Sequence, residues 1–218
     1  MLITFANQKG GVGKSSLALL FANWLSSIGE KVLVIDLDRQ GTIYYQRERD
    51  KSLMDNQSFN YEVIHYEIDT PTQEIIDTLN QLKIDNKDAF ILIDAPGNLS
   101  ENGLVPFLVL ADCIICPFQY ERKSLDSTGT FIVVLQNLLR HYKTAPKQIF
   151  IPNRIRLGLG KKDEKEIFAQ TEEIFKQYGD VAPFIKELQC LARVNSISIN
   201  REQEKAVEES FKWIKDNI

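Results

Sequence analysis

Short apolar runs alternate along the chain with longer amphipathic segments. Buried parallel strands are predicted at Leu2–Asn7, Lys31–Asp36, Ala89–Asp94, Cys113–Pro117 and Gln148–Pro152, with a shorter one at Tyr61–Tyr66. Helices are predicted at Lys14–Ile28, Pro71–Leu82, Leu99–Leu110, Ser124–Tyr142, Lys162–Tyr178 and Arg201–Ile218. This alternation predicts an α/β fold with a mostly parallel sheet and helices on both of its faces. No repeat or linker interrupts the pattern, so we expect a single domain over residues 1–218.

The composition is ordinary for a soluble globular protein, with 44% hydrophobic and 26% charged residues in a chain of 218. No apolar run approaches the roughly 18–20 residues that cross a bilayer. No basic segment stands before Met1–Phe5, so we expect the chain to start in a strand rather than in a signal peptide.

The three cysteines are an odd number, which favours a reducing cytoplasm over an exported, disulfide-bonded protein. Cys113 and Cys116 form a C-x-x-C pair on a predicted strand. Because they are three positions apart, their side chains should face opposite sides of the sheet. We therefore interpret them as buried small hydrophobic residues rather than as a metal or redox site.

The formal net charge of −4 argues against a general affinity for nucleic acid. The charge is unevenly distributed, however, because residues 140–162 contain no Asp or Glu. The basic residues of this segment are Arg140, Lys143, Lys147, Arg154, Arg156, Lys161 and Lys162. They form either one exposed basic patch or a set of scattered, solvated charges.

The loop Gln8–Ser15 joins the first predicted strand to the first predicted helix. Its glycines let backbone N–H groups approach phosphate oxygens, and the helix N-terminus adds further N–H groups. We expect Lys14 to reach the β- and γ-phosphates and the Ser15 hydroxyl to bind Mg²⁺. The expected nucleotide-binding residues are Gly10, Gly11, Val12, Gly13, Lys14, Ser15 and Ser16. Gln8 departs from the common pattern G-x-x-x-x-G-K-S/T, which has glycine at that position.

Three carboxylates stand at the ends of two other predicted strands. Asp36 and Asp38 follow one strand, and Asp94 closes another. The carboxyl ends of parallel strands meet at the edge where such sheets bind ligands. We expect one carboxylate to hold Mg²⁺ through water and another to orient an attacking water. The alternative, that Asp36 and Asp94 only form turns, is the weaker interpretation beside a phosphate loop.

Three segments, in this order, resemble the motifs of the ParA/MinD group of ATPases. Lys9–Ser15 resembles the deviant Walker A motif, which is marked by its first lysine. Asp36–Gly41 resembles the D-x-D-P-Q-G segment, and Phe90–Pro96 resembles the Walker B strand. Arg39 stands where the group usually has Pro, a serine pair replaces the usual Thr pair at 15 and 16, and Gly97 replaces a second Pro.

The resemblance implies a P-loop NTPase fold and an ATP-dependent homodimer that hydrolyses ATP slowly with Mg²⁺ and a stimulating partner. Lys9 would cross to the phosphates of the partner subunit; the alternative is an ordinary solvated lysine. By motif position, Asp38 would position the attacking water and act with Lys9 and Lys14 in catalysis. Asp36 and Asp94 would work around Mg²⁺, and Asn153 would contact adenine.

Within the group, the sequence favours a small ParA-type ATPase that partitions plasmid, mobile-element or chromosomal DNA. It would bind DNA non-specifically through Arg156, Lys161 and Lys162, respond to a partner of ParB type, and be cytoplasmic and nucleoid-associated. Lys161 and Lys162 lie in or beside a Gly-containing loop where exposure is expected.

The sequence gives less support to three alternative functions. A MinD-like membrane ATPase needs a basic interfacial helix, but Arg201–Ile218 carries five acidic and four basic residues. Its apolar stripe is therefore attributed to core packing, and no stable membrane binding is expected. A reductase resembling the nitrogenase iron protein needs cysteines placed to bridge a cluster between subunits, which Cys113 and Cys116 do not offer. A small-molecule ligase is disfavoured because Lys9 suits a dimeric switch, although the sequence leaves this alternative open.

Overall fold

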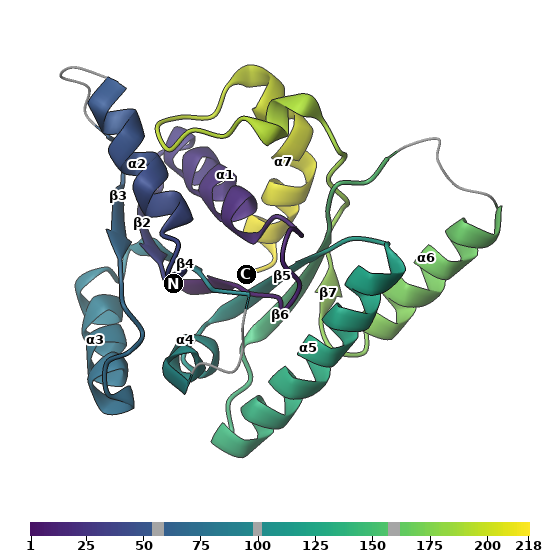
Figure 1. Ribbon diagram of the computed structural model, residues 1–218, viewed down its shortest axis with the longest axis horizontal. Helices are drawn as coiled ribbons and strands as arrows, with labels where there is room; N and C mark the ends of the chain where they lie inside the picture. Colours follow the sequence, from purple (N-terminus) through teal and green to yellow (C-terminus); the bar gives the residue numbers. More distant parts are fainter. Residues whose placement is uncertain (54–58, 98–101, 157–161) are drawn as a thin grey trace.

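The computed structural model describes residues 1–53, 59–97, 102–156 and 162–218. In these residues seven parallel strands form one sheet in the order β3-β2-β4-β1-β5-β6-β7 (Figure 1). The strands are β1 (Leu2–Phe5), β2 (Lys31–Asp36), β3 (Glu62–His65), β4 (Ala89–Asp94), β5 (Cys113–Phe118), β6 (Lys147–Pro152) and β7 (Asp180–Val181). The α-helices are α1 (Lys14–Ser27), α2 (Thr42–Leu53), α3 (Thr72–Asp85), α4 (Val105–Val109), α5 (Arg122–Tyr142), α6 (Lys162–Phe175) and α7 (Arg201–Asp216). The predicted α/β fold is confirmed.

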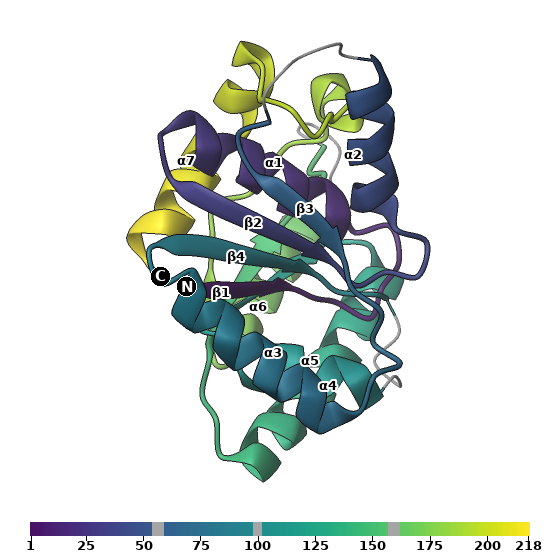
Figure 2. The same ribbon diagram turned by 90° about the vertical axis from the view of Figure 1, so that its left-hand side faces the viewer.

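The helices cover both faces of the sheet. Figures 1 and 2 show α1, α2 and α7 on one face and α3, α4, α5 and α6 on the other. Each face buries its own cluster of apolar side chains because successive residues of a strand point to opposite sides. The parallel strands are covered on both faces, which explains why they read as continuous apolar runs.

The cysteine pair follows the same alternation. Cys113 packs with the α1 side of the sheet and Cys116 with the α5 side, as predicted, and both side chains are buried. Burial raises the pKa of the Cys113 thiol to about 12 and also raises that of Cys116. Both cysteines therefore behave as small core residues, and their thiolate forms are suppressed at neutral pH.

Several elements differ from the sequence prediction. α2 was not predicted, because its twelve residues bury only Ile43, Arg47 and Asp50 and show no apolar stripe. The helix predicted at Leu99–Leu110 is a 3-10 turn at Asn102–Leu104 followed by the short α4, with residues 98–101 outside the described part. The two-residue strand β7 and the 3-10 turn Gln189–Ala192 were also not predicted. Both are too short to give a periodic signal.

Candidate functional site

The strand order brings the three sequence motifs to one edge of the sheet. β1 lies between β4 and β5, and β2 lies beside β4. The parallel register pairs Asp94 with both Phe5 at the end of β1 and Asp36 at the end of β2. The phosphate loop that follows β1 therefore lies next to two strand-end carboxylates, at the edge where parallel sheets bind ligands.

The backbone of the loop requires glycine at two positions. Gly11 and Gly13 have φ angles of +81° and +97°, a left-handed region that glycine adopts without strain. At Gly13 an added Cβ would also lie 2.5 Å from the amide nitrogen of Asn153. No described side chain caps the N-terminus of α1, so its first backbone N–H groups can bind an anion.

Asn7, which sequence reasoning did not single out, anchors the start of the loop. Its fully buried amide nitrogen donates to the carbonyl oxygen of Pro117 at 2.8 Å and to the hydroxyl of Thr128 at 2.9 Å. Its amide oxygen accepts from the backbone N–H of Lys9 at 3.1 Å. The loop is thus fixed to the end of β5 and to α5.

Asn153 anchors the other end of the loop. Its amide nitrogen donates to the carbonyl oxygen of Val12 at 2.8 Å, and the side chain is buried against Gly13. The resemblance implies that Asn153 contacts adenine, and the structure places its side chain against the glycine loop. Its amide group has a second task, however, because it holds the phosphate loop in shape.

Lys14 carries a positive charge into the centre of the site. Its side chain is only 8% exposed, and an added Cβ on Gly97 would lie 3.7 Å from its Nζ. Burial lowers the pKa of Lys14, while the nearby carboxylates of Asp94 and Asp38 oppose that shift. A buried cation at a helix N-terminus is suited to binding phosphate oxygens.

Asp94 supplies the feature that fits a metal ion. The residue is fully buried, and neither carboxylate oxygen makes a hydrogen bond of regular geometry to any described residue. Burial raises its pKa to about 7; Asp36 and Asp38 add to the shift, whereas Ser15 and Lys14 oppose it. Buried polar groups without a partner are rare in proteins, so this carboxylate is suited to a water-bound cation. Asp94 and the Ser15 hydroxyl are oxygen ligands of the kind Mg²⁺ prefers.

The fit to Mg²⁺ does not need a dedicated cage. Within the described part of the chain, no three His, Cys, Asp or Glu side chains gather closely enough to hold a metal alone. Mg²⁺ usually keeps several waters and is completed by one or two protein oxygens and by substrate phosphates. The donor set present at Asp94 and Ser15 is of that kind.

The carboxylate of Asp36 accepts hydrogen bonds from three backbone N–H groups. The donors are the N–H groups of Asp38 at 3.0 Å, Ile43 at 2.8 Å and Tyr44 at 3.0 Å. Asp36 therefore satisfies the free donors at the start of α2, and its negative charge lies at the positive end of that helix. Burial raises the pKa of Asp36, and these hydrogen bonds oppose the rise. A carboxylate has about four acceptor positions, which leaves room for one further contact such as a metal-bound water.

Asp38 lies in the loop between β2 and α2 and is partly exposed. One carboxylate oxygen accepts from the N–H of Gln40 at 2.9 Å. Its carbonyl oxygen accepts from the N–H of Gly41 at 2.7 Å. Arg39 points outward and pairs with Asp69 at 2.9 Å, with both side chains largely exposed. The loop keeps a tight turn at Asp38 although Arg39 replaces the usual proline.

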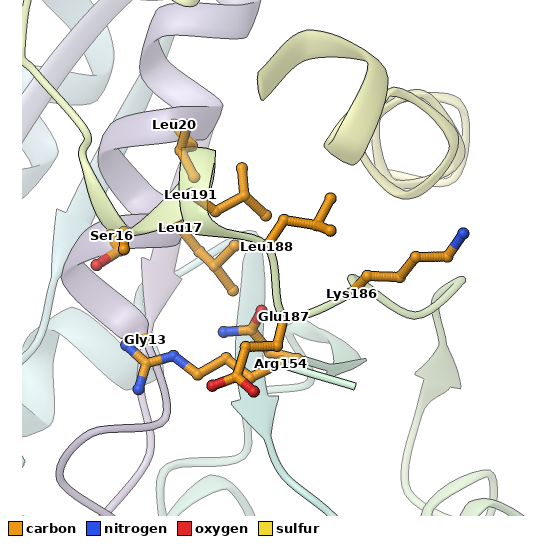
Figure 3. A pocket seen from close by; sticks show the side chains of 11 residues that line it. Gly13, Ser16, Leu17, Leu20, Arg154, Lys186, Glu187, Leu188 and Leu191 are labelled. Atoms are coloured by element: carbon orange, nitrogen blue, oxygen red, sulfur yellow. The ribbon is translucent and has the colours of Figure 1, made fainter. Parts of the chain in front are cut away.

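A cavity of about 260 Å³ opens beside the phosphate loop (Figure 3). Its walls combine apolar side chains of α1 with those of the segment after β7. The lining residues are Gly13, Ser16, Leu17, Leu20, Asn153, Arg154, Lys186, Glu187, Leu188, Leu191 and Ala192. Figure 3 shows Arg154 and Glu187 close together near Gly13, and Leu17, Leu188 and Leu191 on the apolar side. The cavity thus adjoins the phosphate loop and has apolar walls and a charged rim.

Residues 3–198 match the family model described as the CobQ/CobB/MinD/ParA nucleotide binding domain. The chain belongs to this family.

Two relatives are partition or regulatory proteins. The chromosome-partitioning ATPase Soj of Thermus thermophilus is 28% identical over 156 residues, which are 62% of this chain and 61% of that protein. The sporulation initiation inhibitor protein Soj of Bacillus subtilis is 23% identical over 181 residues, 66% of this chain and 68% of that protein. The matched segment thus spans less than two thirds of the Thermus protein and about two thirds of the Bacillus protein.

Solved structures share the fold over nearly the whole chain. A putative plasmid partition protein from Borrelia burgdorferi, bound to AMPPNP, is 24% identical with a TM-score of 0.74 and covers 100% of this chain and 99% of that chain. The MinD cell division protein of Aquifex aeolicus is 19% identical with a TM-score of 0.72, over 99% of this chain and 97% of that chain. These matches show that the fold is shared, and the family model identifies a nucleotide-binding domain of the CobQ/CobB/MinD/ParA type.

The residues expected to contact a second subunit or DNA differ in how exposed they are and in how much of them the structure describes. Lys9 is partly exposed. Arg156, expected at a DNA surface, forms an ion pair with Glu187. Lys161 lies outside the described residues, and Lys162 begins α6 with a side chain that is not described. Of the three proposed DNA-binding side chains, the structure therefore describes only Arg156, and their grouping on one surface stays a prediction.

The last helix, α7, packs its apolar stripe against the protein. Val207, Phe211 and Ile214 are fully buried, and the Phe211 ring lies 5.0 Å from that of Phe21 in α1. This agrees with the interpretation of the stripe as core packing. Among the described residues, none of the helices combines the length and hydrophobicity that a bilayer crossing requires.

Proposed function

We propose that the chain binds ATP with Mg²⁺, hydrolyses it slowly, and uses the bound nucleotide to select between monomer and dimer. The observation that carries this proposal is the electrostatic proximity, at a glycine loop, of a buried lysine, Lys14, to the buried carboxylate of Asp94, whose oxygens make no regular hydrogen bond to a described residue. A site of this charge pattern suits a polyanion together with a divalent cation. The family match and the AMPPNP bound in the Borrelia structure support a nucleoside triphosphate as that ligand.

The residues divide the chemistry among them. Lys14 and the backbone N–H groups of the loop neutralise and orient the β- and γ-phosphates. Ser15 and Asp94 would hold Mg²⁺, directly or through water, with Asp36 as a further acceptor for a metal-bound water. Bound Mg²⁺ supplies positive charge that offsets the charge developing on the transferred phosphoryl group. Asp38 accepts a hydrogen bond from the attacking water and aligns it for in-line attack.

The base and sugar would occupy the cavity that continues from the loop. Its apolar walls at Leu17 and Leu191 suit a planar ring, and the amide oxygen of Asn153 can accept from an exocyclic amino group. Arg154 and Glu187 form the charged rim on the solvent side. This arrangement supports the proposed contact of Asn153 with adenine.

The dimer and its DNA partner extend the proposal beyond one site. Lys9, partly exposed beside the loop, would contact the phosphates held by a second subunit. The ATP-bound dimer would hold DNA non-specifically through Arg156, Lys161 and Lys162 and release it after hydrolysis stimulated by a partner of ParB type. The names of the Soj and plasmid-partition relatives support this role, which would place the protein on DNA in the cytoplasm.

ATP-dependent retention on DNA tests the proposal. We expect the wild-type protein to bind DNA of any sequence with ATP and Mg²⁺, and to lose binding steeply as salt rises, because phosphate neutralisation releases counterions. The triple variant Arg156→Glu, Lys161→Glu, Lys162→Glu should lose retention while it still binds ATP.

A matched triple variant on α7 provides the control. Arg201, Lys205 and Lys212 are exposed, and their replacement by Glu makes the same change in net charge. If the α7 variant loses DNA retention and the Arg156/Lys161/Lys162 variant keeps it, the contact surface lies on α7. If wild-type protein binds DNA equally with and without ATP, the proposed nucleotide switch is wrong.

A further inference from the structure

His65, the last residue of the edge strand β3, reaches the loop that carries Asp38. The parallel register places His65 beside Asp36 of β2. Figure 2 shows β3 alongside α2, and the side chain of His65 belongs to the face that α2 covers. Its ring nitrogen Nε2 lies 3.1 Å from the carbonyl oxygen of Asp38. Neither the motifs nor the family resemblance assigns this residue a role.

The partner atom determines which tautomer makes this contact. A carbonyl oxygen only accepts, so Nε2 of His65 must carry the hydrogen and donate it. The same oxygen of Asp38 also accepts from the N–H of Gly41 at 2.7 Å, so two donors converge on one carbonyl. The His65 ring stacks on Tyr44, with centroids 5.6 Å apart and planes 28° apart. Tyr44 in turn donates its N–H to Asp36, which ties the imidazole to the start of α2.

We propose that His65 is a positioning residue for hydrolysis, acting through Asp38 rather than on the nucleotide. This inference rests on the proposed role of Asp38. The carboxylate of Asp38 has one hydrogen bond within its own loop, to the N–H of Gln40. The carboxylate of Asp36 holds the backbone N–H of Asp38 to β2, and His65 holds its carbonyl oxygen to β3. Since misplacement of a reacting group by about 1 Å can cost about 10²-fold in rate, such a fastening matters for the direction of the attacking water.

The phosphate loop is held by different residues. Asn7 fixes it to β5 and α5, and Asn153 fixes it to β6. Neither anchor involves β3. Loss of the His65 contact should therefore slow hydrolysis and leave the affinity for ATP unchanged, whereas general damage to the fold would lower both.

Two substitutions separate the hydrogen bond from the bulk of the ring. His65→Gln keeps an amide N–H that can reach the position of Nε2, and His65→Leu keeps an apolar side chain without a donor. We expect His65→Leu to lower the kcat for ATP about 10- to 100-fold, with the Kd for ATP within about twofold of wild type. His65→Gln should retain at least about half of the wild-type kcat, because the donor to Asp38 is preserved.

A double variant gives the decisive measurement. If His65 acts through Asp38, adding His65→Leu to Asp38→Ala should cause no further loss of kcat. Additive losses, a wild-type kcat in His65→Leu, or equal losses in His65→Gln and His65→Leu would each overturn the inference. If Asp38→Ala itself hydrolyses ATP at the wild-type rate, the proposed role of Asp38 fails, and the inference falls with it.

Discussion

Replacing Asp94 with Asn in the metal-free protein measures how much the ionisation of this buried carboxyl group destabilises the fold. Asp94 is fully buried at the end of β4, and both of its carboxylate oxygens lack a regular hydrogen bond among the described residues. Burial raises its pKa from 3.8 to about 7. Asn has nearly the same size and stays neutral at every pH. The variant therefore removes the titration and keeps the packing.

The sign of the effect follows from the two pKa values. The pKa of Asp94 is higher in the folded protein than in the unfolded chain, so its contribution to stability is present at low pH. That contribution is lost as the pH rises from about 4 through about 7, because ionisation costs more in the folded state. Each pH unit between the two values corresponds to about 1.4 kcal/mol. Between pH 5 and pH 8 the wild type should lose about 2–3 kcal/mol relative to Asp94→Asn, or about 5–10 °C in Tm.

Thermal unfolding of both proteins in a chelator, without nucleotide, at pH 5, 6, 7 and 8 measures this difference. Groups that titrate in both proteins cancel when the two Tm values are subtracted at each pH. Parallel curves for the two proteins would refute the assignment of a strongly raised pKa to Asp94. A second series with ATP and Mg²⁺ should restore stability to the wild type at pH 8 and not to the variant. Equal restoration would exclude Asp94 from the Mg²⁺ site.

Three other substitutions give separate expected outcomes. Lys9→Ala should bind ATP about as tightly as wild type but remain monomeric by light scattering, since its contact lies across the proposed interface; normal dimerisation would make it an ordinary solvated lysine. Glu187→Gln should increase DNA retention about two- to fivefold at fixed salt by freeing Arg156 from its ion pair. Unchanged retention at unchanged ATP affinity would place Arg156 outside the DNA surface. Asn7→Ala should destabilise the protein by about 2 kcal/mol, because the buried carbonyl of Pro117 loses its amide donor. A change in unfolding free energy below about 0.5 kcal/mol would contradict that anchoring role.

The phosphate loop and the Walker B strand could be predicted because their chemistry is local. A glycine loop between a strand and a helix constrains the backbone within eight residues, and Asp94 follows an apolar run that can only be a buried strand. The sheet order then brings the two together. Helix α2 was not predicted because it has no apolar stripe. The carboxylate of Asp36 stabilises its start instead.

The remaining features depend on contacts between residues far apart in sequence. Asn7 meets Thr128 across 121 positions, and His65 meets Asp38 across 27. Neither contact leaves a pattern in the sequence, because an isolated Asn or His is compatible with many environments. The ion pair of Arg156 with Glu187 has the same character. A basic segment in the sequence therefore did not predict which of its charges are already paired.

Calorimetric titration of ATP into wild-type protein and into Lys14→Ala, each with Mg²⁺ and with chelator, tests the central claim most directly. The claim is that Lys14 and Asp94 form one site for a triphosphate and its cation. We predict binding to the wild type that strengthens at least tenfold with Mg²⁺, and no measurable binding to Lys14→Ala. Binding of equal affinity to both proteins, or wild-type binding that is the same without Mg²⁺, would contradict the account.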